Sequence, residues 1–160
     1  MPITVQAVGL MKKKTAEIEL KQHYMDNAAR LCQAQGFGKI NELEYVENAK
    51  QNVAERKALE AKHLLNHIQP SDYVIILDEN GKSISSRQFS STLQDELSQS
   101  RHVHFLLGGP DGHGDACLQR ANLKLSFGRM TWPHRLARIL LYEQIYRAMT
   151  IMTNHPYHRD

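Results

Sequence analysis

The side chains best suited to chemistry in this chain of 160 residues lie at its carboxyl end. Two imidazoles, a phenol and a guanidinium fall within five positions, at His155, Tyr157, His158 and Arg159. Pro156 stiffens the backbone after the first imidazole. Such a set can grip a phosphate or a base and can exchange a proton near neutral pH. A tail with chance histidines would look the same, so the preceding elements must decide between these two interpretations.

Composition limits the class of protein. The net formal charge is +3, and residues 101–160 carry eight Lys and Arg against four Asp and Glu, together with six of the nine histidines. This modest basic half is compatible with RNA as a partner. No run of eighteen apolar residues and no secretory signal pattern are present, so we expect no membrane span. Cys32 and Cys117 form no CxxC pattern, which favours buried thiols in a reducing cytoplasm.

Apolar periodicity predicts alternating strands and helices. Strands are expected at 3–8, 40–46, 73–77, 103–107 and 123–126, and helices at 15–33, 52–67, 86–97, 115–120 and 133–153. The continuous β-branched run at 73–77 is typical of a strand buried on both faces of a parallel sheet, and residues 78–81 are expected to form a turn after it. The alternation predicts one α/β domain over residues 1–160, with a mostly parallel sheet and helices on both faces.

The last expected helix is apolar around more than one face. Glu143 and Arg147 form an i,i+4 pair on the remaining polar strip. A helix this apolar has to be buried on two sides. In so small a chain the second side is most economically another copy of the chain, so we expect a homodimer.

Familiar nucleotide and metal motifs are absent. The chain has neither a GxGxxG in register nor a Gly-Lys-Ser/Thr. Gly108 and Gly109 still follow a parallel strand, where backbone amides approach ligands, although a plain tight turn explains them equally well. His102 and His104 share a strand face without a third ligand nearby in sequence, so no metal site is expected. The lysine run at 12–14 is better explained as a solvated loop than as a phosphate contact.

Three segments taken together are more specific than any of these features. They are FLLGGPDG at 105–112, LSFGRMTWPH at 125–134 and the stretch 140–159 that ends in HPYHR. Together they resemble the ribosomal large-subunit RNA methyltransferase H family, and the resemblance runs nearly end to end. This family is similar to a minimal form of the SPOUT class. The resemblance therefore implies an α/β sheet with a carboxyl-terminal trefoil knot.

The resemblance also implies an activity. Members are homodimers that use S-adenosylmethionine to methylate N3 of a pseudouridine in 23S ribosomal RNA, and the tail of one subunit reaches the cofactor pocket of the other. With a charge of only +3, we expect the assembled ribosome to be needed to position the chain. The cofactor-binding residues implied are Leu77, Gly108, Gly109, Phe127, Gly128, Arg129, Met130, Thr131 and Trp132. The catalytic residues implied are His155, Tyr157, His158 and Arg159.

The implied roles make chemical sense. A sulfonium cofactor already carries the driving force for methyl transfer, so the protein has to position the acceptor and manage its proton. Spacing does not choose between His155 and His158 as the base, while Arg159 can stabilise negative charge and Tyr157 can stack on a nucleobase. Two alternatives stay open. One is a non-catalytic ribosome-binding or assembly protein with the same fold, and the other is a SPOUT methyltransferase that acts on transfer RNA.

Overall fold

The computed structural model describes residues 2–11 and 15–160, so the lysine run at 12–14 lies outside the described residues. The elements in chain order are β1 (Ile3–Val8), α1 (Ala16–Ala34), β2 (Ile40–Tyr45), α2 (Val53–Leu65), β3 (Tyr73–Lys82), α3 (Ser86–Ser98), β4 (Val103–Leu107), α4 (Asp115–Arg120), β5 (Leu123–Leu125) and α5 (His134–Met152). The expected order of strands and helices is confirmed. Only the end of β3 differs from the expected boundaries by more than two residues.

The longer helices begin where a side chain can satisfy a free backbone N–H. The hydroxyl of Thr15 accepts the N–H of Ile18 before α1, and Asn52 caps α2 in the same way. Ser85 and Gln88 form a reciprocal capping box at the start of α3. These caps explain why the chain turns into helices directly after its loops.

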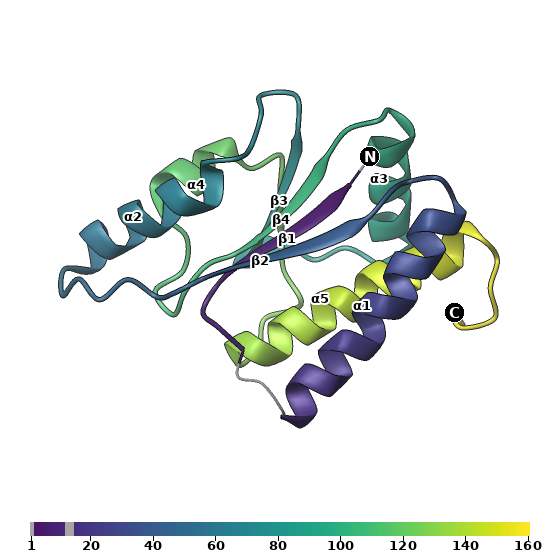
Figure 1. Cartoon of the computed structure of the whole chain (residues 1–160), viewed down its shortest axis with the longest axis horizontal. Helices are drawn as coiled ribbons and strands as arrows, with labels where there is room; N and C mark the ends of the chain where they lie inside the picture. The colour runs from purple at the N-terminus through teal and green to yellow at the C-terminus, as the bar shows by residue number, and fades with distance from the viewer. Residues whose placement is uncertain (1, 12–14) are drawn as a thin grey trace.

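The five strands form one parallel sheet in the order β2-β1-β4-β3-β5. Helices α1, α3 and α5 cover one face, and α2 and α4 cover the other (Figure 1). The predicted parallel α/β sheet with helices on both faces is therefore confirmed. Because all strands run the same way, their carboxyl ends meet at one edge, where the loops after β3, β4 and β5 come together.

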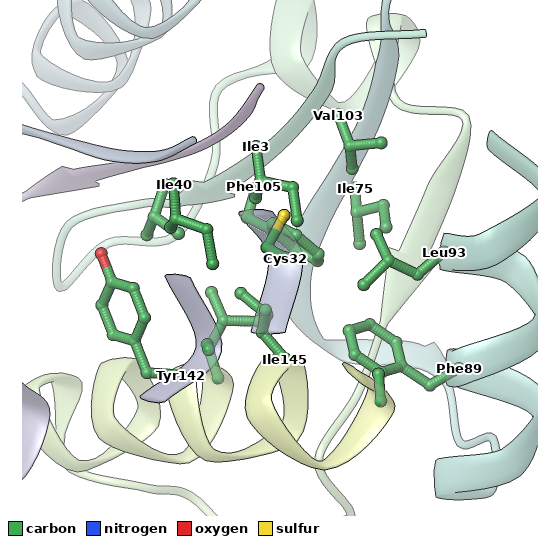
Figure 2. Close-up of a cluster of buried hydrophobic side chains, with 14 of the residues drawn as sticks. Ile3, Cys32, Ile40, Ile75, Phe89, Leu93, Val103, Phe105, Tyr142 and Ile145 are labelled. Carbon is green, nitrogen blue, oxygen red and sulfur yellow. The ribbon is translucent and has the colours of Figure 1, made fainter. Parts of the chain in front are cut away.

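Alternation along the strands divides the core into two layers. Ile75 and Phe105 point towards α1, α3 and α5, where Figure 2 shows them among Phe89 and Ile145. Their neighbours in sequence point the other way, and Leu106 packs with residues of α2 and α4. A sheet buried on both faces explains the continuous apolar runs of β3 and β4.

Helix α5 is buried on two sides, as its composition predicts, but α1 of the same chain provides the second side. It lies between α1 and α3 against the sheet (Figure 1), and Tyr142, Ile145 and Met149 are fully buried. The apolar pattern of α5 therefore does not by itself require a second copy. Leu136, near the start of α5, is 38% exposed. Among the described residues, no helix is both long and apolar enough to cross a membrane.

Strand β3 is longer than expected, and the predicted simple turn at 78–81 is wrong. Leu125 of β5 pairs with Leu77 and again with Lys82, so residues 78–81 form an irregularity between two pairings. A Cβ on Gly81 would lie 2.7 Å from the β5 backbone, and only glycine allows the strands to approach this closely. Contact with the neighbouring strand sets the path of this segment.

Candidate active site

Three adjoining cavities open where β3, β4 and β5 end. The largest, which we call the glycine-turn cavity, has a volume of about 460 Å³. Next to it are a loop cavity of about 150 Å³ and an outer cavity of about 430 Å³. Trp132 lines all three, and Leu77 lines the glycine-turn and loop cavities. The cavities therefore occupy the edge of the sheet at which open α/β folds bind ligands.

The turn after β4 forms one wall of the glycine-turn cavity. Gly108 and Gly109 both line it, and the N–H of Gly112 donates to the carbonyl of Gly109 at 3.0 Å. A Cβ on Gly108 would lie 2.9 Å from the carbonyl oxygen of Gly112, so the folded turn has no room for a side chain. This wall consequently presents main-chain groups to the cavity.

The loop between β5 and α5 lines the loop cavity and reaches the glycine-turn cavity through Trp132. The hydroxyl of Ser126 accepts the N–H of Gly128 at 3.1 Å and lies 2.9 Å from the carbonyl of the same residue. Gly128 has a φ of +112°, a conformation that favours glycine. The loop residues that line the loop cavity are Phe127, Gly128, Met130, Thr131 and Trp132. Arg129 is exposed and is not among the residues that line the three cavities.

Acidic side chains dominate the rim of the glycine-turn cavity. Asp78, Glu79 and Asp111 line it together with Lys57. Asp111 is paired with Arg56 at 2.8 Å, and Asp78 and Glu79 outnumber Lys57, the one lysine among the lining residues. The rim therefore favours a ligand that carries positive charge.

Two histidines that the motif search missed also line the glycine-turn cavity. Nε2 of His113 lies 3.0 Å from the carbonyl oxygen of Leu77, and Nε2 of His134 contacts the carbonyl oxygen of Val8. His134 thus meets the last residue of β1, and His113 meets the residue of β3 that precedes its irregularity. His134 ends the LSFGRMTWPH segment, but no role was predicted for either residue, because their partners are 36 and 126 positions away in sequence.

The four candidate catalytic residues lie in the tail after α5, and Tyr157 anchors it. Its ring contacts Tyr146, with 4.6 Å between centroids, and the guanidinium of Arg147 lies 4.8 Å from its centroid. Its hydroxyl donates to Glu143 at 2.9 Å. Burial and this hydrogen bond raise the pKa of the Tyr157 phenol, which keeps it neutral. The ring is therefore already in contact with α5 in this structure.

Of the other tail residues, His158 and Asp160 contact the helices, whereas His155 and Arg159 are exposed. Nδ1 of His158 lies 3.3 Å from a guanidinium of α5, and Nε2 lies 3.3 Å from Asp160. Asp160 also accepts from Arg87 of α3 at 2.7 Å, and this contact lowers the pKa of Asp160 to about 2. His155 and Arg159 are exposed. These two are consequently the candidate catalytic side chains best placed to meet another molecule.

The tail begins at the end of α5 that is farther from the glycine-turn cavity, and it turns back along the helix as far as Glu143. His134 and Ala137, at the start of the helix, line the cavity, whereas the tail follows Met152 at the other end (Figure 1). A helix of 19 residues is about 28 Å long. None of residues 155–160 is among those that line the three cavities. A tail in this position does not complete the cavity of its own chain.

A second cluster of ionisable groups lies at the other edge of the sheet. Asp72 joins His102 and His104, and their ligand-type atoms lie within 4.8 Å of one another. The sequence did not reveal this carboxylate, because it is 30 positions before His102. The protein already uses both ring nitrogens of His104: Nδ1 lies 3.1 Å from the amide of Gln6, and Nε2 lies 3.2 Å from Asp72. The absence of a metal stays a prediction.

We expect His104 to make stability depend on pH. Burial and the neighbouring His102 lower its pKa to about 4, against the opposing effect of Asp72, while Arg120 lowers it further. The unfolded state therefore binds more protons than the folded state between pH 6.5 and 4. The contribution of His104 to the free energy of unfolding is fully present above pH 6.5. About 3 kcal/mol of it is lost as the pH approaches 4. Urea unfolding at pH 7 and pH 4.5 measures this loss. The variant His104→Gln should lose less stability over this range, and an unchanged loss would contradict the assignment.

A comparison with known families identifies the chain. The family model described as "Predicted SPOUT methyltransferase" matches residues 1–158. The chain belongs to this family. Ribosomal RNA large subunit methyltransferase H of Bartonella henselae is 44% identical over 160 residues, covering 99% of each chain. The proteins of that name from Chelativorans sp. and Allorhizobium ampelinum are 42% and 40% identical, covering 99% and 100% of this chain and 91% and 100% of their own lengths. The resemblance expected from the three segments is thus confirmed.

Proposed function

We propose that this SPOUT family member is an S-adenosylmethionine-dependent methyltransferase that modifies N3 of a pseudouridine in large-subunit ribosomal RNA. The observation that carries the proposal is the glycine-turn cavity at the carboxyl ends of the parallel strands. Two of the three segments that resemble the methyltransferase H family contribute to its lining. The full-length similarity to proteins named ribosomal RNA large subunit methyltransferase H supports RNA of the large subunit as the substrate. A cytoplasmic location and the family's knot belong to the same proposal.

The cavity suits the cofactor in size and chemistry. Its volume of about 460 Å³ is within the range of small-molecule sites. Main-chain groups of the glycine turn and the 127–132 loop can bind the adenine, and Leu77 and Trp132 provide apolar surface. The acidic side chains of Asp78 and Glu79 favour the positively charged sulfonium and ammonium groups. When bound, S-adenosylmethionine supplies an electrophilic methyl group.

The chain's own residues must hold the base and remove the N3 proton. His155 and Arg159 are the exposed candidates in the tail. An imidazole can accept a proton near neutral pH, and a guanidinium can stabilise the resulting anion or bind a flanking phosphate. In this proposal Tyr157 and His158 hold the tail against α5. His158 stays an alternative base.

A homodimer would bring the tail of one chain to the cavity of the other. None of residues 155–160 lines a cavity of its own chain, so we propose that the tail reaches the cavity of a second copy. Three large apolar side chains near that cavity are available to a partner: Met130 is 76% exposed, Trp132 43% and Leu136 38%. A partner that covered them would bury apolar surface and bring its tail to the cavity in one step.

Cofactor binding and methyl incorporation test the proposal. We expect purified protein to bind S-adenosylmethionine in calorimetry and to transfer radiolabelled methyl groups to assembled ribosomes that lack the modification. Free ribosomal RNA should be a poorer substrate, because a charge of +3 provides few phosphate contacts. Undetectable cofactor binding would overturn the proposal. Methyl incorporation into transfer RNA in place of ribosomes would assign the chain to a different substrate.

A further inference from the structure

His113 lies directly behind the glycine turn and points back to β3. Its side chain is only 6% exposed, although it follows a loop glycine with a φ of +81°. Nε2 lies 3.0 Å from the carbonyl oxygen of Leu77. A neutral imidazole reaches this acceptor as the Nε2–H tautomer. The hydrogen bond therefore joins the loop after β4 to the residue of β3 that precedes its irregularity.

Leu77 is the last residue of β3 before its pairing with β5 becomes irregular. The last β3–β4 pair is Ile76 with Leu106, and the β3–β5 register shifts directly after Leu77. Leu77 also lines both the glycine-turn and loop cavities. The imidazole of His113 thus holds a peptide that forms part of both cavity walls. A carbonyl oxygen has two lone pairs, so this one can still accept a hydrogen bond from a ligand.

Packing alone does not explain a histidine at this position. Burial lowers the pKa of His113, so the ring is neutral near pH 7. With the proton on Nε2, Nδ1 is a buried acceptor that has no hydrogen-bond partner among the described residues. An apolar ring of similar size would fill the same space without this unpaired acceptor. The imidazole's specific contribution is the Nε2–H donated to Leu77.

We propose that His113 is a positioning residue for the cofactor site, and that its hydrogen bond fixes the Leu77 carbonyl in the orientation that binds the adenine amino group of S-adenosylmethionine. This inference rests on the proposed function. Removing the donor leaves the backbone of Leu77 held only by its pairing with Leu125, so the carbonyl is less firmly oriented and cofactor affinity falls. The methyl-transfer step itself does not involve His113, so kcat at saturating cofactor is retained.

Two substitutions separate positioning from packing. His113→Phe keeps the ring volume and removes the donor, whereas His113→Gln keeps an amide N–H close to the position of Nε2. Calorimetry should show a Kd for S-adenosylmethionine about tenfold higher for His113→Phe and within about threefold of the original for His113→Gln. His67→Gln, on an exposed residue beyond α2, is the matched control and should change nothing. Thermal unfolding without cofactor verifies that each variant is folded.

The outcomes distinguish this inference from the proposed function. If the unchanged protein binds the cofactor and His113→Phe binds it equally well, the positioning role is wrong and the proposed function stands. Equal losses in His113→Phe and His113→Gln would show that ring packing matters and the donor does not, which also overturns the inference. If the unchanged protein fails to bind S-adenosylmethionine, the proposed function and this inference fall together.

Discussion

Deleting residues 155–160 is expected to abolish methyl transfer while cofactor binding is retained. The deletion removes His155 and Arg159, the exposed tail groups proposed to contact the RNA base. Loss of a positioned acid–base group costs about 100-fold or more in rate. No residue of the deleted segment lines the three cavities, so the Kd for S-adenosylmethionine should change by less than about twofold. Methyl incorporation, calorimetry and sedimentation together measure activity, cofactor affinity and dimerisation.

A matched control separates catalysis from anchoring of the tail. Asp160→Asn keeps His155 and Arg159 but weakens the exposed ion pair with Arg87. An exposed pair of this kind contributes little to stability, so this variant should be nearly fully active. Full activity of the chain that lacks 155–160 would show that the tail is dispensable. Loss of cofactor binding in that chain would place the tail within the cofactor site.

The second large effect, a loss of cofactor affinity, is expected from the single methyl group that Gly108→Ala adds. In Gly108→Ala the new Cβ would lie 2.9 Å from the carbonyl oxygen of Gly112, and neither backbone segment can yield without opening the turn. The wall of the glycine-turn cavity would move, and the Kd for S-adenosylmethionine should rise more than about tenfold. Strain in so crowded a site should also lower the free energy of unfolding by about 1–3 kcal/mol.

Gly36→Ala provides the comparison for that substitution. Gly36 follows α1 with a φ of +77°, and a Cβ there would meet nothing within 4 Å. The alanine should therefore cost about 1 kcal/mol of stability through backbone strain alone. Because Gly36 lines none of the three cavities, cofactor affinity should be unchanged. Equal cofactor affinities in Gly108→Ala and the original protein would remove the glycine turn from the proposed site.

Much of the fold was predictable because it depends on local patterns. The continuous apolar run at 73–77 indicated a strand buried on both faces, and Thr15 indicated the start of α1. The path of residues 78–81 was not predictable from local sequence. It depends on the close approach of Gly81 to β5, whereas the letters Asp-Glu-Asn-Gly are those of an ordinary turn. Likewise, composition showed that α5 is buried on two sides but did not show that α1 covers the second.

In the candidate site, too, features set by local sequence were predictable and features set by distant contacts were not. The segments around Gly108 and at 127–132 stand out in sequence, and the structure brings most of them to adjoining cavities. His113, His134 and Asp72 were missed because each acts through a partner distant in sequence. The tail was found by composition alone, since its aromatic and cationic residues are adjacent. Its anchoring through Tyr157 depends on α5 and became visible only in three dimensions.

Mixing the two variants tests the central claim most directly, at a cofactor concentration too low to fill the cavity of Gly108→Ala, so that each variant alone is inactive. The chain without residues 155–160 keeps the cavity, and Gly108→Ala keeps the tail. If the tail of one subunit completes the cavity of the other, subunits that are exchanged by unfolding and refolding together should form heterodimers with one intact site each. Equal mixing should restore about a quarter of the original methyl-transfer activity. A mixture that stays as inactive as its two components, although mass spectrometry shows heterodimers, would contradict a site shared between subunits.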